Sequence, residues 1–327
     1  MYINSASLDI TYRCNLHCRH CYNFSGVCPF PEMDDSQLHH VALELSSHDF
    51  SSICLCGGEP LCRKDALLMV ARTIKESNPS TALSMVSNGL LWNEDIAREI
   101  YDSGVRTVQF SLDGFTEESY DFVRQSGGQL KKVFRTIEIS LQQGFDVMVS
   151  TLPHRKSLRE FPAIIQYCEK VGVSEIRVQP LMPLGRGEEN YKDLCLTEEE
   201  YEELSEMLDM YKNTSKIRVT WGDPIDHFFM YQEEGRIPQV AVNAYGEILV
   251  SPYLPISIWD LKSRALNEYL DLRIDECALR HPIVRKCLED IMEVKDLTSR
   301  RSGLPELFLE QNLNIQDELL SETARKA

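Results

Sequence analysis

Cys14, Cys18 and Cys21 lie close together in the chain, with the spacing C-x3-C-x2-C. A short apolar segment containing Leu8 and Ile10 precedes them. Three thiolates on one tight loop can ligate three irons of a four-iron, four-sulfur cluster and leave the fourth iron without a protein ligand. An open iron can chelate a substrate or a cofactor, which a fully ligated electron-transfer cluster cannot do.

Two other interpretations of these cysteines remain at this point. A structural zinc site needs four closed ligands, and Cys28, His17 or His20 offers a fourth. A disulfide framework fits less well, because the count of eleven cysteines is odd and Met1–Asp9 has neither the basic nor the long apolar part of a secretory leader. We therefore expect a reducing, cytoplasmic location.

Polar motifs follow several apolar segments that we expect to be strands. Gly57-Gly58-Glu59-Pro60 follows the apolar run 53–56. Glycines let a backbone approach a ligand closely, and a carboxylate accepts charge-assisted hydrogen bonds from an ammonium group. Taken alone, the motif is also typical of an ordinary turn between a strand and a helix.

Two further motifs occupy the same position on later strands. Ser87-Asn88-Gly89 ends the segment 82–86, and Ser111-Leu112-Asp113-Gly114 ends the segment 105–110. The carboxyl ends of successive parallel strands are where barrel active sites form. These motifs are therefore expected to line one site.

The elements that position these motifs follow from the periodicity of the chain. Strands are expected near 7–12, 51–56, 82–86, 105–110, 145–151 and 175–180. Amphipathic helices are expected near 35–48, 64–77, 94–102, 129–143 and 157–171. Asp34 with Gln37, and Thr197 with Glu200, are typical of capping boxes that begin helices. The alternation predicts a parallel sheet: an α/β fold that is a partial (β/α)6 TIM-like barrel with a small C-terminal α+β extension.

Taken in order, these motifs resemble the signature of the radical S-adenosylmethionine (radical SAM) superfamily, in which an aromatic residue commonly follows the third cysteine, as Tyr22 does here. The resemblance implies one [4Fe-4S] cluster on Cys14, Cys18 and Cys21. It also implies a SAM site in which Glu59 binds the methionine amino group and Arg124 lies near the carboxylate. The segment Pro180–Gly187 is expected to pass beside the adenine. The residues implied for SAM binding are Tyr22, Gly57, Gly58, Glu59, Ser87, Asn88, Ser111, Asp113, Arg124 and Met182.

The resemblance also implies the reaction. A reduced cluster would cleave SAM to methionine and a 5′-deoxyadenosyl radical, which abstracts a hydrogen atom from the substrate. The electron would come from a flavodoxin- or ferredoxin-type donor. The cofactor carries the hard chemistry, while the protein supplies positioning and the exclusion of water. The motifs name no further catalytic residue.

The chain after residue 187 has a different pattern. The segments 239–243 and 247–251 are expected to form a hairpin around Ala244-Tyr245-Gly246. This hairpin resembles the one that opens the SPASM and twitch extensions of peptide-modifying radical SAM enzymes. We therefore divide the chain into a barrel core at 1–187 and an extension at 188–327.

The extension departs from that family pattern at Ser251, where a cysteine normally ligates an auxiliary cluster. A hydroxyl is a poor iron ligand beside a thiolate, and the cysteines that follow are Cys277 and Cys287 alone. We expect no second cluster.

Other cysteines have no assigned ligand role. Cys54, Cys56, Cys62 and Cys168 lie in apolar patterns typical of buried, inert thiols. One cysteine near the site could give a hydrogen atom to a product radical, but the sequence does not choose it.

The composition sets further limits. A chain of 327 residues with a formal net charge of −17 disfavours broad binding to nucleic-acid backbones. No apolar run reaches the roughly 18 residues of a membrane-spanning helix. Three functions stay open: a radical enzyme that modifies a ribosomally made peptide, one that acts on a small molecule or tetrapyrrole, and a non-catalytic metal-binding module.

Overall fold

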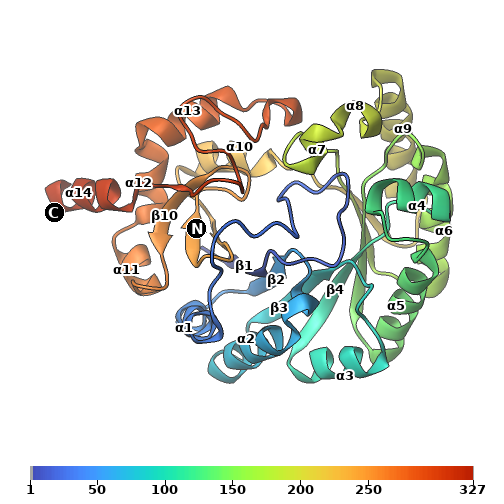
Figure 1. Ribbon diagram of the computed structural model, residues 1–327, viewed down its shortest axis with the longest axis horizontal. Coiled ribbons are helices and arrows are strands. Elements are labelled where there is room, and N and C mark those ends of the chain that lie inside the picture. Colours follow the sequence, from blue (N-terminus) through green and yellow to red (C-terminus); the bar gives the residue numbers. More distant parts are fainter. Residues whose placement is uncertain (1–2, 327) are drawn as a thin grey trace. The chain divides into compact units, whose positions relative to one another are not determined.

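The chain alternates strands and helices through most of its length (Figure 1). The computed structural model describes residues 3–326. It divides into two compact units. The first contains the described residues up to Cys14, Asn23–Leu83, and the chain from Ile225 onward, and the second contains Asn15–Tyr22 and Ser84–Pro224.

The first unit is a mixed sheet with helices. Its strands are β1 (Ser5–Thr11), β2 (Ser52–Gly57), β8 (Gln239–Val242), β9 (Glu247–Leu249), β10 (Ile256–Asp260) and β11 (Leu313–Asn314). They are ordered β11-β10-β9-β8-β1-β2. Strand β1 runs parallel to both β2 and β8, while β9 is antiparallel to β8 and β10. The antiparallel β8–β9 pair is the predicted hairpin.

The helices of the first unit follow its strands. They are α1 (Asp35–Ser46), α2 (Lys64–Ser77), α10 (Asp226–Glu234), α11 (Leu266–Asp271), α12 (Ile274–Arg280), α13 (Pro282–Asp290) and α14 (Gln316–Lys326). Short 3-10 turns η1 (Pro60–Arg63) and η3 (Val294–Asp296) accompany them. The predicted capping box begins α1, because Asp34 accepts from the Gln37 amide and the Gln37 side chain accepts from the Asp34 amide.

The second unit is built on parallel strands. They are β3 (Ala82–Ser87), which begins in the first unit, β4 (Val105–Ser111), β5 (Asp146–Thr151), β6 (Glu175–Val178) and β7 (Arg218–Trp221). Strands β4 to β7 pair in sequence order, each parallel to the next. The helices are α3 (Glu94–Asp102), α4 (Glu117–Arg124), α5 (Leu130–Gln143), η2 (Leu158–Glu160), α6 (Phe161–Val171), α7 (Arg186–Glu189), α8 (Tyr191–Leu194) and α9 (Glu198–Thr214).

The core follows the predicted periodicities. In β1, Leu8 and Ile10 are fully buried, and in β2 Ile53 and Leu55 are fully buried. Side chains of a strand alternate between two faces, so these residues form one apolar face. The amphipathic helices α1 and α2, on one side of these strands (Figure 1), bury their own apolar stripes.

Two features differ from the expected pattern. Helix α4 was not predicted, because its eight residues are fewer than the window over which a helical period is read. The parallel order also continues past residue 187 through β7. The division into a core at 1–187 and an extension at 188–327 stays a prediction. No helix in residues 3–326 combines the length and the apolar composition that a membrane span requires.

Candidate active site

The turn after β2 is hydrogen-bonded to the chain that leads to the first cysteine. The Gly58 amide donates to the Thr11 carbonyl at 2.7 Å, and the Glu59 amide donates to the Arg13 carbonyl at 2.9 Å. Thr11 ends β1, and Cys14 directly follows Arg13. The backbone of Glu59 is thus fixed one residue away from Cys14.

The two glycines of this turn are required by the approach of these chains. A Cβ at Gly57, whose φ is +123°, would lie 2.4 Å from the Thr11 carbonyl oxygen. A Cβ at Gly58 would lie 2.4 Å from the Arg13 carbonyl oxygen. Any larger residue would push the turn away from the cysteine loop. The observed neighbours of both glycines are backbone atoms. Our expectation that the glycines also let a ligand approach stays a prediction.

Glu59 is a fully buried carboxylate in this turn. Its side chain accepts from the Leu61 amide at 3.2 Å and so caps the short turn η1. A buried anionic group needs partners to offset its desolvation. Its position next to the start of the cysteine loop suits the recognition of an ammonium group.

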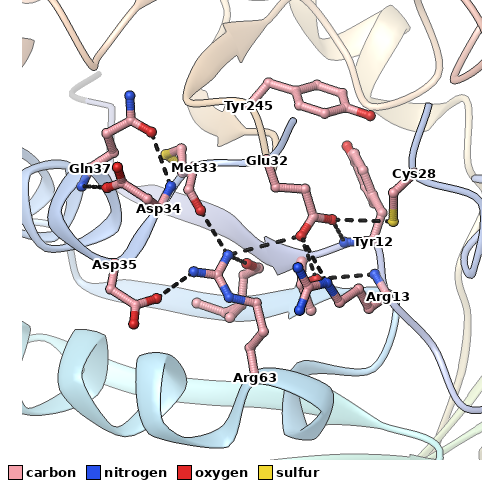
Figure 2. Close-up of polar contacts among 12 residues, drawn as sticks. Tyr12, Arg13, Cys28, Glu32, Met33, Asp34, Asp35, Gln37, Arg63 and Tyr245 are labelled. Carbon is pink, nitrogen blue, oxygen red and sulfur yellow. Dashed lines mark hydrogen bonds and ion pairs between the residues drawn. The ribbon is translucent and has the colours of Figure 1, made fainter. Parts of the chain in front are cut away.

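A second carboxylate, Glu32, organises the end of β1, and the sequence analysis did not identify it (Figure 2). It accepts from the Thr11 hydroxyl at 2.7 Å and from the Tyr12 amide at 2.5 Å. The Arg63 guanidinium lies 3.9 Å away, and the Cys28 thiol donates to Glu32 at 3.6 Å. Cys28, which the zinc interpretation offered as a fourth ligand, is therefore an exposed thiol bonded to Glu32.

Arg63 connects this network to the turn η1. Its guanidinium donates to the Met33 carbonyl at 2.9 Å, to the Ile10 carbonyl at 3.3 Å and to Asp35 at 2.6 Å (Figure 2). Side chains from three segments thus fix the strand that enters the cysteine loop. No local pattern signals Glu32 or Arg63, because their partners are distant in the sequence.

In the second unit, Arg124 joins Asp113 to Cys18. The Arg124 Nε donates to Asp113 Oδ2 at 2.5 Å, and Nη1 lies 3.8 Å from the Cys18 sulfur. Asp113 Oδ1 accepts from the Leu152 amide at 2.8 Å. The Asp113 side chain is 2% exposed and that of Arg124 is 12% exposed. Three residues assigned from sequence to one site are thus in contact.

The charges in this cluster are fixed by burial and by the ion pair. Burial alone would raise the pKa of Asp113, but the Arg124 guanidinium and the other polar neighbours together outweigh burial and lower that pKa below its usual value. Burial and the charge of Arg124 together lower the pKa of His20 to about 3, against the opposing effect of Asp113. His20 is therefore neutral near pH 7, and its 3.8 Å approach to Asp113 is not an ion pair. Its Nδ1 is buried and has no hydrogen-bond partner among the described residues.

The remaining strand-end residues are largely buried. Asn88 donates from Nδ2 to Asn15 Oδ1 at 2.8 Å, which ties the end of β3 to the cysteine loop. Ser87 accepts from the Gly89 amide at 3.0 Å. Ser111 is 8% exposed at the end of β4. The assignment of these residues to SAM binding stays a prediction.

The segment after β6 packs on the second half of the cysteine loop. The Arg186 amide donates to the Cys21 carbonyl, and Arg186 Nε donates to the Cys18 carbonyl, both at 2.9 Å. A Cβ at Gly185 would lie 2.4 Å from the Tyr22 carbonyl oxygen. Met182 is half-buried in the same segment. Arg186 was not singled out from sequence, although its place between two glycines marks a close approach of two chains.

The cysteine loop supplies the donor set of an iron–sulfur cluster with one open iron, which is three thiolates on one short segment. All eleven cysteines lie in the described residues, and no disulfide joins any two of them there. Among these described residues, no three His, Cys, Asp or Glu side chains are placed to hold one metal ion. A zinc site needs ligands that converge on one ion, whereas each thiolate of a cluster binds a different iron. The guanidinium of Arg124 beside Cys18 suits a ligand set of negative charge.

The hairpin region has a different chemistry. Ser251 is fully buried, and its hydroxyl lies 2.8 Å from His227 Nε2. The same hydroxyl accepts from the Tyr253 amide at 3.1 Å. Cys277 and Cys287 are buried in α12 and α13. The count of clusters stays a prediction.

The other cysteines only partly match the expected pattern. Cys168 is a buried core thiol as predicted, but Cys54, Cys56 and Cys62 are only half-buried, so that prediction was wrong for them. In β2 the fully buried residues Ile53 and Leu55 occupy the core face. The alternating cysteines must therefore point to the other face.

Comparison with known proteins identifies the family. The Radical SAM superfamily model matches residues 8–168. The chain is 27% identical over 231 residues to the sporulation killing factor maturation protein SkfB of Bacillus subtilis strain 168, covering 70% of this chain and 53% of SkfB. It is 28% identical over 183 residues to an AdoMet-dependent heme synthase of Methanosarcina barkeri strain Fusaro, covering 56% and 52%. It is 30% identical over 204 residues to a GTP 3′,8-cyclase of Clostridium botulinum strain Hall, covering 61% and 62%. The chain thus spans about half to three fifths of the length of these relatives.

Solved structures share the fold. SuiB of Streptococcus suis bound to S-adenosylmethionine superposes with a TM-score of 0.68 at 12% identity, covering 92% of this chain and 77% of SuiB. The same enzyme bound to its precursor peptide SuiA gives a TM-score of 0.65 at 12% identity, covering 92% and 75%. The enzyme anSMEcpe with AdoMet and the Cp18Cys peptide gives 0.62 at 16% identity, covering 98% and 96%. These likenesses confirm the predicted α/β fold class. The chain belongs to the radical SAM superfamily of enzymes.

Proposed function

We propose that the chain binds one [4Fe-4S] cluster on Cys14, Cys18 and Cys21, holds SAM beside it, and removes a hydrogen atom from a ribosomally made peptide. The observation that carries this proposal is the backbone pairing of the Gly57–Glu59 turn with the residues before Cys14. Through that pairing, the turn that bears Glu59 is hydrogen-bonded to Arg13, the residue before Cys14. When bound, the cluster and SAM supply the radical chemistry.

The chain's own residues bind and orient SAM in this proposal. Glu59 accepts a charge-assisted hydrogen bond from the methionine ammonium. Asp113 holds Arg124 through Nε, so that the other guanidinium nitrogens address the methionine carboxylate and the thiolate of Cys18. Tyr22, Gly57, Gly58, Ser87, Asn88, Ser111 and Met182 complete the proposed contacts.

A peptide substrate is supported by two relatives. SkfB is a maturation protein of the sporulation killing factor, and it matches 70% of this chain. SuiB, which shares the fold, is found bound to its precursor peptide. The hairpin β8–β9, which resembles that of peptide-modifying enzymes, adds to this support.

The remaining parts of the proposal concern partners and location. A flavodoxin- or ferredoxin-type protein supplies the electron. The odd count of eleven cysteines suits a reducing cytoplasm. The net charge of −17 disfavours nucleic-acid partners. We propose no membrane partner.

A second candidate is a radical enzyme acting on a tetrapyrrole or another small molecule. It is favoured by the heme synthase and the GTP cyclase, which match this chain at 28% and 30% identity, as closely as SkfB does at 27%. The proposed cofactor site is the same for both candidates, and they differ in substrate alone.

One experiment tests both the cleavage of SAM and the identity of the substrate. The anaerobically reconstituted, reduced protein is incubated with SAM and with short peptides encoded near its gene. We expect 5′-deoxyadenosine and a mass change in one peptide, and neither with the Cys14→Ala/Cys18→Ala/Cys21→Ala variant. Modification of a tetrapyrrole with no change in any peptide would favour the second candidate. Absence of 5′-deoxyadenosine with every substrate would contradict both.

A further inference from the structure

Two thiols and one carboxylate share a face of the first unit. Cys56 of β2 lies opposite Asp9 of β1 in the parallel register, and its thiol donates to Asp9 Oδ1 at 3.3 Å. Cys54, two residues earlier on the same face, has its carbonyl oxygen 3.8 Å from the Cys56 sulfur. Asp9, Cys54 and Cys56 are not among the residues assigned to the iron–sulfur cluster or to SAM binding.

These side chains are less buried than their neighbours on the two strands. Leu8, Ile10, Ile53 and Leu55 are fully buried on the face toward the apolar core. Asp9, Cys54 and Cys56 are half-buried on the opposite face. The apolar face of these two strands already packs into the core. The opposite face, which bears the thiols, is not needed for that packing.

Cys56 also lies near the carboxyl end of β2, the strand end that leads into the proposed SAM-binding turn. Cys56 directly precedes Gly57, Gly58 and Glu59. In parallel α/β folds, catalytic groups occupy the carboxyl ends of the strands. The Cys56 thiol is therefore near the carboxyl end of β2, three residues before the proposed SAM ligand Glu59.

The surroundings keep this thiol protonated. Its contact with Cys54, its burial and the neighbouring Asp9 carboxylate raise the pKa of Cys56 well above the usual thiol value. Burial raises the pKa of Asp9 to about 6, while hydrogen bonds from Cys56 and Tyr12 lower it and the charge of Glu32 raises it. The pair thus combines a sulfur that keeps its hydrogen with a carboxyl group that exchanges a proton near neutral pH.

We propose that Cys56 is the hydrogen-atom donor that quenches the substrate radical, with Asp9 as the group that returns its proton; this rests on the proposed function. A substrate carbon radical takes the hydrogen atom from Cys56, so that a C–H bond forms, the S–H bond breaks and a sulfur radical remains. One electron from the flavodoxin- or ferredoxin-type donor and one proton from the Asp9 carboxylic acid then restore the thiol. Asp9 regains its proton from water.

Cys56 combines a half-buried position with a carboxyl partner on this face, Asp9. Cys168, Cys277 and Cys287 are buried. Cys28 is exposed and bonded to Glu32, which also holds the end of β1. Cys62 is half-buried in the turn η1 and serves as the matched control.

The first test measures thiol reactivity in the purified full-length protein without SAM or substrate. Cys56 is labelled with iodoacetamide at pH 8, and the labelled peptide is followed by mass spectrometry. We expect Cys56 to label faster in Asp9→Asn than in the wild type, because removal of the carboxylate lowers the thiol pKa. Labelling at Cys62 should stay the same. An unchanged rate at Cys56 would overturn the proposed pairing with Asp9.

The second test uses SAM and D₂O as probes, with the reduced, reconstituted protein and no added substrate. Thiol hydrogens exchange with D₂O, so a donor within reach of the site passes deuterium into the released 5′-deoxyadenosine. The readout is deuterium per 5′-deoxyadenosine, which does not depend on the rate of SAM cleavage. We expect deuterium transfer in the wild type and in Cys62→Ser, and its loss in both Cys56→Ser and Cys56→Ala.

The outcomes separate this inference from the proposed function. Formation of 5′-deoxyadenosine with wild-type deuterium content in both Cys56 variants would overturn the inference and leave the proposed function standing. Loss of deuterium in Cys54→Ser with retention in the Cys56 variants would also overturn it. Absence of 5′-deoxyadenosine in the wild type would overturn the proposed function and the inference together.

Discussion

The cysteine loop and the hairpin region both present a polar residue after a strand, but the surroundings of that residue differ. In the loop, Cys18 lies beside the Arg124 guanidinium, and its carbonyl accepts from Arg186. In the hairpin region, Ser251 is fully buried and bonded to His227. Burial raises the pKa of the Cys18 thiol, and the Arg124 guanidinium opposes this by favouring the thiolate. By contrast, a buried hydroxyl with its own partners is a structural group.

The comparison shows that a similar backbone structure does not guarantee the same metal-ligating chemistry. The hairpin is formed as the family resemblance predicts, with β8 and β9 antiparallel. At the position of the expected ligand, however, the hydroxyl already has two hydrogen-bond partners, His227 and the Tyr253 amide. We expect the loop to hold iron and the hairpin region to hold none.

The largest expected effect comes from removing the loop's ligands. Replacement of Cys14, Cys18 and Cys21 together by alanine should abolish the visible absorption of the reconstituted protein, because no thiolate remains to hold the irons. Circular dichroism should show a folded chain. A variant that keeps its brown colour would mean that the iron is bound elsewhere, and the contrast between the two regions would fail.

The next effect tests the charges around the loop. Arg124→Met should leave the buried Asp113 carboxylate without its partner and lower the free energy of unfolding by about 3–5 kcal/mol. Urea denaturation of the protein without its cofactors measures this loss. The exposed pair Arg98–Asp95 offers a control, and Arg98→Met should change the free energy by less than about 1 kcal/mol. Equal losses in the two variants would show that the Asp113–Arg124 pair is not buried as described.

A smaller effect, on SAM binding, is expected when the Glu59 carboxylate is replaced. Glu59→Gln keeps the side-chain volume but removes the charge, so SAM binding should weaken by about 1.5–3 kcal/mol. Anaerobic titration calorimetry with SAM measures the change, with Glu76→Gln on the exposed side of α2 as the control. If the two variants bind SAM equally well, Glu59 does not contact the ammonium.

The smallest effect belongs to the hairpin region. Ser251→Ala removes the hydrogen bond with His227 and should lower the free energy of unfolding by about 1 kcal/mol. Urea denaturation measures this loss, with Ser263→Ala at an exposed serine as the control.

Ser251→Cys should bind no iron beyond that of the wild type, because Cys277 and Cys287 are buried in separate helices. Extra iron in Ser251→Cys would show that the region retains a ligand set.

Much of the fold could be predicted, because the alternation of Leu8 with Ile10 and of Ile53 with Leu55 is a local signal of buried strands. The site was predicted as a set of motifs, since Gly57–Glu59 and Asp113 lie at strand ends. The roles of Glu32 and Arg186 and the Asp9–Cys56 pair were not, because these contacts join residues far apart in the sequence. The accessible face of β2 was missed because cysteine is common in apolar cores.

Iron and sulfide analysis of the anaerobically reconstituted wild-type protein tests the central claim most directly. One cluster, held by the loop and absent from the hairpin region, predicts about four irons and about four sulfides per chain. The variant without Cys14, Cys18 and Cys21 should then retain neither. About eight irons per chain, with a cluster that survives the loss of these three cysteines, would contradict the account.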